Sequence, residues 1–352
     1  MPPTNDVNSA GEAYRRLDTY PELKQRIRAA GLLDLQPRYY ALKITLTLGV
    51  LAILFALTYQ VDGWMSLAVA AVQGVMFTQV AMLGHDLQHR QVVRKRALVS
   101  LFGVALGDFL LGVSYSWWSS KHNAHHGNPN RVGSDPDIDF PVLAFSEEQL
   151  AEKRPALHWL LARQAYLFFP FSTLQAVNMQ LMAFDHAFRE RPAHRVWEAT
   201  ALIAHVALYV VLLAHLGWLM AIASFMVQMG VAGLYNGIVF APNHKGMVMF
   251  GRDEEPDFAT MQVLSSRNVY GHPITDFVYG GLNYQIEHHL CPTMPRNNLH
   301  RAQPMVREYC AQNGLPYVEE SATGSIRAIL SHLHEVSAGL RTPRRNSPSE
   351  AS

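Results

Sequence analysis

Cysteine is scarce in this chain: Cys291 and Cys310 are the only two in 352 residues. Two thiols cannot build the disulfide framework of a small secreted module, and they cannot complete a four-thiolate zinc site. Charge is scarce too, since Asp, Glu, Lys and Arg make up 16% of the chain, against about 25% in an average soluble domain. The net charge is only +1. A basic nucleic-acid binder is therefore excluded, and no nucleic-acid partner is expected.

Lys and Arg are absent from two long stretches, residues 44–89 and 196–244. Each stretch contains two apolar runs that are separated by a short break. A helix needs about 20 mostly apolar residues to cross the hydrocarbon core, so each stretch is long enough for two crossings. Buried hairpins of a soluble bundle are the alternative, but such long intervals without cations favour a membrane. We expect two helical hairpins with four spans, at about residues 42–60, 64–84, 197–216 and 219–241.

The cations also indicate an orientation. All 29 Lys and Arg lie before, between or after the hairpins, and the turns of the hairpins contain none. The excess of positive charge on cytoplasmic segments then places both termini and the middle of the chain in the cytoplasm. Trp64 and Trp218 lie at the turns, where amphipathic rings suit the opposite membrane interface.

The remaining segments complete the predicted organisation. Two further apolar segments are interrupted by Asp108, Gly112, Arg163 and Pro170, so we interpret them as interfacial or partly buried helices rather than spans. These two segments are residues 97–118 and 160–182. We expect a polar cytoplasmic segment with a short helix at 22–33, a membrane domain, and a cytoplasmic C-terminal segment whose tail from Arg341 is disordered. Their bounds are 1–39, 40–310 and 311–352.

Histidine is abundant, with 17 residues, and seven of them have the spacing of metal ligands. Rings at positions i, i+3 and i+4 share a helical face, so they can point at one ion. Three clusters show this spacing, and a single histidine follows the fourth span. The clusters are His85 and His89; His122, His125 and His126; and His288 and His289, which follow Gln285; the single residue is His244.

Ligand counting indicates two metal ions, because one tetrahedral ion takes about four ligands. Imidazole suits iron, zinc and copper alike, so the ligand type does not identify the metal. No separate general base is apparent, which favours a redox enzyme over a zinc-dependent membrane hydrolase. Two irons could activate dioxygen for attack on an unactivated C–H bond, such as those of an acyl chain. The largely apolar spans disfavour a transport path.

The order of four motifs resembles that of the membrane-bound fatty acid desaturases. The motifs are HDLQH, HNAHHGNPN, FAPNHKGM and NYQIEHHLCPTMPR, which extend from His85 to Arg296. The family's three histidine boxes correspond here to HDLQH (residues 85–89), HNAHH (122–126) and QIEHH (285–289). More narrowly, the chain is similar to members with QxxHH in the third box, the front-end type and its actinobacterial relatives. The resemblance implies an all-α integral membrane protein with a cytoplasmic helical cap around a di-iron site. It implies an oxidoreductase that uses O2 and two electrons to place a double bond in an acyl chain, with a fatty acyl hydroxylase as the alternative.

Carried over residue by residue, the resemblance implies that the two non-haem irons are bound by the eight histidines. Gln285 stands where many relatives have the first histidine of the third box, and it is expected to bind weakly, through water, or to orient a ligand. Asp86 and Glu287 are placed to accept the second ring N–H of a ligand histidine. The ligands would be His85, His89, His122, His125, His126, His244, His288 and His289.

The resemblance also bears on partners and location. The chain lacks the HPGG haem motif of a fused cytochrome b5 domain; its nearest string is residues 271–274. Electrons are therefore expected from an external donor, such as a ferredoxin, a cytochrome or a flavin/iron–sulfur reductase. Basic residues near the boxes could dock an acidic donor: Arg90, Arg94, Lys95, Arg96 and Lys121. A bacterial plasma membrane is the expected location, and the acyl carrier and double-bond position stay open.

Overall fold

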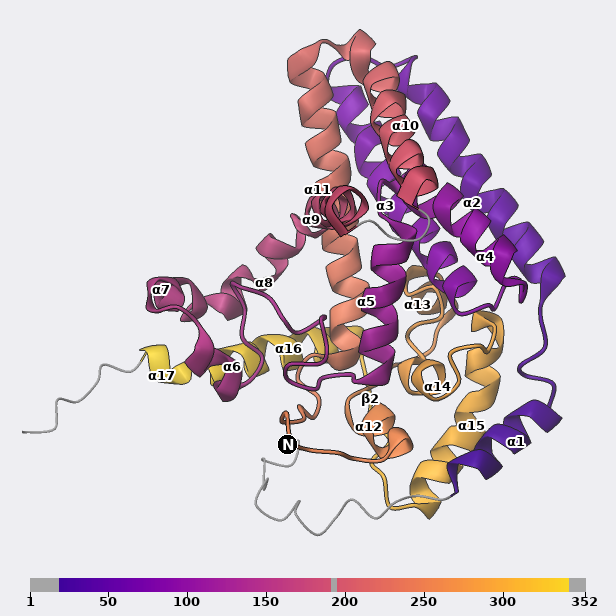
Figure 1. Cartoon of the computed structure of the whole chain (residues 1–352), viewed down its shortest axis with the longest axis vertical. Helices are drawn as coiled ribbons and strands as arrows, with labels where there is room; N and C mark the ends of the chain where they lie inside the picture. Colours follow the sequence, from indigo (N-terminus) through magenta and orange to yellow (C-terminus); the bar gives the residue numbers. More distant parts are fainter. Residues whose placement is uncertain (1–18, 191–194, 342–352) are drawn as a thin grey trace, which may run out of the picture.

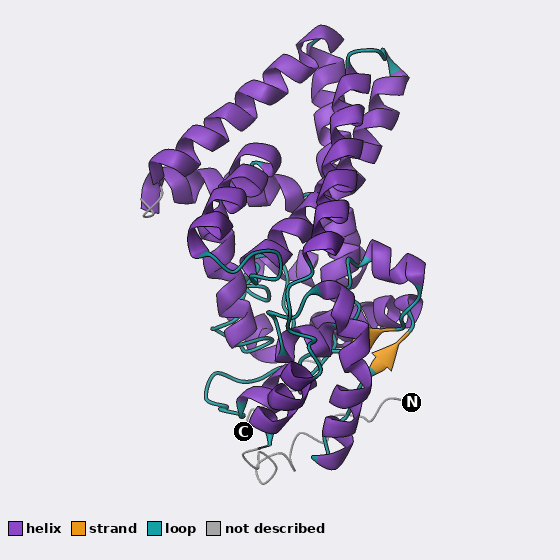
Figure 2. Ribbon diagram, turned by 90° about the vertical axis from the view of Figure 1, so that its right-hand side faces the viewer, coloured by secondary structure: helices purple, strands orange, loops and turns teal. Residues whose placement is uncertain are grey.

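The computed structural model describes residues 19–190 and 195–341. These residues are mostly helical, with one two-stranded parallel sheet that pairs β1 (Asn268–Val269) with β2 (Glu319–Glu320). Figure 2 shows helices extending above a lower half in which most of the loops and the small sheet lie. The tail that was predicted to be disordered lies outside the described residues after Arg341, which itself ends helix α17.

Four helices are long and apolar enough to cross a membrane, and they match the four predicted spans. Trp64 and Trp218, at the starts of two of them, are 82% and 77% exposed, as expected for rings at a membrane interface. The first helix begins earlier than predicted because Pro37 suits the first turn of a helix. The four are α2 (Pro37–Thr58), α3 (Trp64–Gln88), α10 (Arg195–Leu213) with the short turn η5 (Ala214–Leu216), and α11 (Trp218–His244).

Helices α3 and α11 lie side by side and make the most extensive contact in this group. The apolar window of α3 is 50% buried, whereas that of α2 is 22% buried. Gly74 permits the close approach, because a Cβ atom there would lie 2.4 Å from the carbonyl oxygen of Gln228. Small residues at helix contacts allow such proximity in membranes. The outer helices α2 and α10 expose apolar side chains such as Ile53 and Val210.

The two apolar segments that were not expected to span are both broken. Helix α4 (Arg96–Gly103) continues into the π-helix η2 (Val104–Leu111), and then Gly112, at φ 70°, turns the chain. Helix α5 (Tyr115–Gly127) leaves at 107° to this pair. Beyond it, α8 (Gln164–Ser172) and α9 (Gln175–Asp185) are separate short helices.

The lower half is a packed helical body. Helix α1 (Tyr20–Ala29) confirms the predicted N-terminal helix, and it packs on α15 (Arg296–Gln312). Helix α16 (Ala322–Val336) packs on α8 and α11, so the C-terminal segment belongs to this body. The predicted boundary at 310/311 falls inside α15. The other helices are α6 (Glu147–Glu152), η3 (Pro155–Leu157), α7 (His158–Leu161), η4 (His186–Glu190), α12 (Phe258–Leu264), α13 (Pro273–Val278), α14 (Gln285–Leu290) and α17 (Ala338–Arg341).

Candidate metal centre

The structure brings all eight candidate histidines together where the long apolar helices end. Helix α3 carries His85 in its last turn, and His89 follows it. Helix α5 begins at the N-cap Ser114, whose side chain accepts from the backbone N–H of Trp117, and carries the second box. Helix α14 carries the third box, and His244 is the last residue of α11. In Figure 1, α5 lies beside the lower part of α11, with α14 close by.

The eight rings form two clusters, each with its ligand atoms within 4.8 Å of one another. The five-histidine cluster contains His85, His89, His122, His126 and His288, and the three-histidine cluster contains His125, His244 and His289. The second and third boxes therefore divide between the clusters, although the sequence suggested that the second box presents one face. Adjacent residues of a helix point about 100° apart, so His125 and His126 lie in different clusters, as do His288 and His289.

Every ring of the three-histidine cluster has its Nδ1 atom held by a protein acceptor. The Nδ1 atom of His125 lies 3.0 Å from a carboxylate oxygen of Asp135. That of His244 lies 3.0 Å from the backbone carbonyl of Ser265, and that of His289 lies 2.7 Å from the amide oxygen of Gln262. Because these oxygens only accept, each Nδ1 carries the proton and each Nε2 has a lone pair. In His125 and His289 that lone pair is available to a metal, whereas in His244 it faces the side-chain nitrogen of Gln285 at 2.8 Å.

The five-histidine cluster has fewer such supports. His85 has its Nδ1 atom 3.3 Å from Asp86, as the sequence predicted for this carboxylate. The Nε2 atoms of His89 and His122 face one another at 2.7 Å. The ring of Trp118 stacks on His122 at 4.5 Å between ring centres.

Several buried ring nitrogens have no hydrogen-bond partner among the described residues. Both nitrogens of His126, both of His288, and Nε2 of His289 are in this position. A buried polar atom without a partner is unfavourable by about 1–3 kcal/mol. Nitrogen lone pairs that converge within 4.8 Å suit iron or zinc. The residues present therefore fit two metal ions, one in each cluster.

The protonation state of the third box also suits metal binding. Burial lowers the pKa of His288 and His289 well below the ordinary histidine range, and neighbouring histidines lower it further. Both rings are therefore neutral near pH 7. Neutral imidazole is the form that binds a metal.

Asp86 belongs to a buried network that sequence reasoning did not anticipate. Its second carboxylate oxygen accepts from Nε of Arg296 and, at 3.0 Å, from the hydroxyl of Tyr40. All three side chains are at most 4% exposed. The guanidinium group compensates the carboxylate charge, so Asp86 stays ionised while it orients His85. The sequence contained one signal for this network, the Arg296 that closes the fourth motif.

The side chain of Gln285 lies between His244 and Asn243. The Gln285 side-chain nitrogen lies 2.8 Å from Nε2 of His244, and its oxygen accepts from Asn243 at 3.2 Å. Gln285 thus contacts a candidate ligand, as predicted, but through its nitrogen rather than its oxygen.

Glu287 does not contact a ligand ring, contrary to the prediction. Its oxygens accept from the side chains of Asn268, at 2.8 Å, and Tyr317, at 2.6 Å. Burial raises its pKa to about 7, although these two hydrogen bonds act in the opposite direction. In helix α14, Glu287 points about 100° away from His288. The side chain of Glu287 is therefore directed away from the five-histidine cluster and towards Asn268 of β1.

Two carboxylates near His125, Asp135 and Asp137, lie close enough to form a third possible metal group with it. Asp135 already accepts from His125 and from the backbone N–H of Asn130, and Asp137 is paired with Lys121. These contacts support the three-histidine cluster without an ion of their own. Nothing in the spacing of Asp135 or Gln262 along the chain singled them out.

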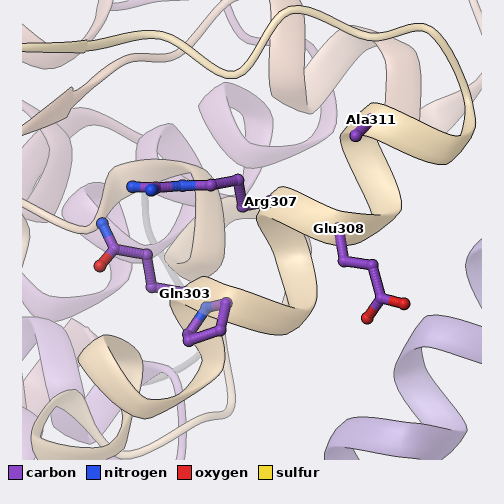
Figure 3. Close-up of a pocket in the computed structure, with 5 residues that line it drawn as sticks. Gln303, Arg307, Glu308 and Ala311 are labelled. Carbon is purple, nitrogen blue, oxygen red and sulfur yellow. The ribbon is translucent and has the colours of Figure 1, made fainter.

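A shallow pocket lies away from the histidines, on helix α15 (Figure 3). Its lining contains none of the eight candidate ligands. The lining residues are Gln303, Pro304, Arg307, Glu308 and Ala311.

Comparison with known proteins agrees with the geometry. Residues 62–321 match the fatty acid desaturase family. A Delta(6)-fatty-acid desaturase from Caenorhabditis elegans is 30% identical over 89% of this chain and 73% of the relative. A Delta(8)-fatty-acid desaturase from Euglena gracilis is 33% identical over 90% and 77%, and a Delta(5) fatty acid desaturase from C. elegans is 33% identical over 87% and 71%. The family match contains all eight clustered histidines, and on this evidence the chain belongs to the fatty acid desaturase family of membrane oxidoreductases.

Proposed function

We propose that this protein desaturates a fatty acyl chain at a di-iron centre held by its eight clustered histidines. One iron would be bound by the five-histidine cluster and the other by the three-histidine cluster. The observation that carries the proposal is the pair of histidine clusters, buried or half-buried, at the ends of apolar helices. Two irons in such a site supply the activation of O2 that an unactivated C–H bond requires.

The protein's own residues would orient the histidine rings and keep water away from the centre. Asp86, Asp135 and Gln262 contact the Nδ1 atoms of three rings, which would leave the Nε2 atom of each ring to bind a metal. The overall reaction balances when the acyl chain loses two hydrogens, and O2 takes these with two electrons and two protons to give two waters. Burial of the rings keeps bulk water from the centre.

The acyl substrate would reach the centre from the bilayer. The relatives are named for double bonds at positions 5, 6 and 8. Together with the QxxHH box, these names support a front-end position near the carboxyl end of the chain. The carrier would be coenzyme A or a lipid.

Electrons would come from an external acidic protein such as a ferredoxin, a cytochrome or a flavin/iron–sulfur reductase. Directly after His89, a basic rim of Arg90, Arg94, Lys95 and Arg96 is exposed. Lys121, included in this group from the sequence, is paired with Asp137 instead. Opposite charge would steer the donor to the rim.

The four helices would cross the membrane as two hairpins, α2 with α3 and α10 with α11. The remaining helices would form a cytoplasmic cap, with both termini and the centre on the cytoplasmic side of a bacterial plasma membrane. The exposed rim supports this orientation, because cations concentrate on cytoplasmic segments.

Expression in a desaturase-deficient host supplied with labelled fatty acids tests the proposal. Gas chromatography with mass spectrometry should detect a new alkene near the carboxyl end, and purified protein should contain iron. A hydroxy acid without an alkene would identify a hydroxylase instead. Zinc with no oxygen consumption would indicate a hydrolase.

A further inference from the structure

One segment outside the histidine boxes contacts all the elements that carry the three-histidine cluster. It comprises residues 258–269, which are helix α12, the turn after it and strand β1. Gln262, Ser265, Arg267 and Asn268 of this segment are at most 4% exposed. Each of them contacts an element that carries a candidate ligand.

The side chain of Gln262 bridges the two clusters. Its nitrogen donates to the backbone carbonyl of His126 at 3.1 Å, and its oxygen lies 2.7 Å from Nδ1 of His289. A carbonyl can only accept, so the amide nitrogen must face His126 and the oxygen must face His289. His289 is then forced to carry its proton on Nδ1, which leaves Nε2 free for a metal.

The next residues hold the end of helix α11. The carbonyl of Ser265 accepts from Nδ1 of His244 at 3.0 Å. The guanidinium of Arg267 donates to the carbonyls of Pro242 and Lys245, on either side of His244. A buried cation at a helix C-terminus satisfies carbonyls that have no partner within the helix.

Asn268 holds helix α14 in the same way. Its side-chain oxygen accepts from the backbone N–H of Ile286 at 2.9 Å, and its nitrogen donates to Glu287 at 2.8 Å. The segment thus fixes α5 through His126, α11 through His244, and α14 through Ile286 and His289.

We propose that Gln262 is a positioning residue that sets the proton position of His289 and couples the two metal clusters, with the rest of the segment 258–269 as its rigid support. This inference rests on the proposed di-iron centre. Gln262 would act through His289 and His126, and it would not touch the substrate. The ring centres of His126 and His289, which belong to different clusters, lie 4.3 Å apart. A shift of one ring relative to the other would therefore change both proposed metal positions.

Three variants separate this role from simple packing. Gln262→Leu removes both hydrogen bonds, whereas Gln262→Glu keeps an oxygen for His289 and removes the amide donor to His126. Gln164→Leu is the matched control, because Gln164 is also 0% exposed and also bonds to backbone groups. Its partners are Ala144 and Leu333, neither of which belongs to a histidine cluster. Each full-length protein is purified and titrated with ferrous iron, and its iron content and Mössbauer spectrum are recorded.

We expect Gln262→Leu to bind the iron of the three-histidine cluster about 10–100-fold more weakly, the usual effect of losing a residue that orients a ligand. Gln262→Glu should keep two irons with a changed Mössbauer spectrum, and Gln164→Leu should keep two irons with the wild-type spectrum. Wild-type iron content and spectrum in Gln262→Leu would overturn the inference alone. A wild-type protein that binds no metal would overturn the proposed di-iron centre and the inference with it.

Discussion

The two histidine clusters differ in what holds their rings. In the three-histidine cluster each Nδ1 atom faces an oxygen of Asp135, Ser265 or Gln262. In the five-histidine cluster, His126 and His288 have no partner for either ring nitrogen among the described residues. The protein thus sets ring orientation in one cluster, whereas in the other the rings mainly contact one another and would be held by the proposed metal.

This difference has a physical consequence. Oriented rings lose little freedom when a metal binds, so their supports contribute directly to affinity. Rings without partners gain most when the metal satisfies their nitrogens.

Loss of a ring from the less supported cluster should abolish activity. We expect His288→Ala to lower desaturation more than 100-fold, since loss of a ligand exceeds the about 10–100-fold effect of losing an orienting residue. His300→Ala is the control, because His300 is exposed on α15 and outside both clusters. Product formation is measured by gas chromatography. Full activity with both irons in His288→Ala would contradict the ligand assignment.

Removal of the metal should destabilise the fold. A ligand at 100 times its dissociation constant stabilises a folded protein by about 2.7 kcal/mol, so chelation should lower the midpoint of thermal unfolding. Hydrogen exchange should rise more around the five-histidine cluster, where the rings lack protein partners. Equal protection before and after chelation would remove the contrast between the clusters.

Weakening one support of the three-histidine cluster should affect one metal. We expect Asp135→Asn to weaken iron binding there about 10-fold, because the two carboxylate oxygens accept from His125 and from the backbone N–H groups of Asn130 and Asp137, whereas an amide has only one oxygen that accepts. Asp139→Asn, an exposed change in the same loop, should leave iron binding unaltered. Iron titration measures both. An equal loss from the two clusters would show that Asp135 does not act on one cluster alone.

The smallest effect is expected at Gln285. Gln285→Ala should reduce activity less than 10-fold, below the usual range for orienting residues, because Nδ1 of His244 stays bonded to Ser265. Gln285→His should retain part of the activity, since a ring at this position keeps a nitrogen near His244. Loss of activity as complete as in His288→Ala would instead indicate that Gln285 is itself a ligand.

The sequence by itself determined the four apolar helices and the eight histidines that cluster. Both follow from local properties: a run of apolar residues sets the length of a span, and i, i+4 spacing brings pairs such as His85 and His89, or His122 and His126, to one side of a helix. Asp86 could be predicted as well, because it is adjacent to His85 in a motif.

Tertiary structure alone decided how the rings divide and what holds them. His125 and His126 belong to different clusters because each meets rings from other helices, His244 and His289 in one case and His89 and His288 in the other. Gln262 reaches His289 and His126 from a segment remote in sequence. Glu287 failed as a prediction because its partners, Asn268 and Tyr317, arrive from strands and loops that no local pattern places there. Hydrogen bonds between distant residues depend on packing, and periodicity along one helix does not encode it.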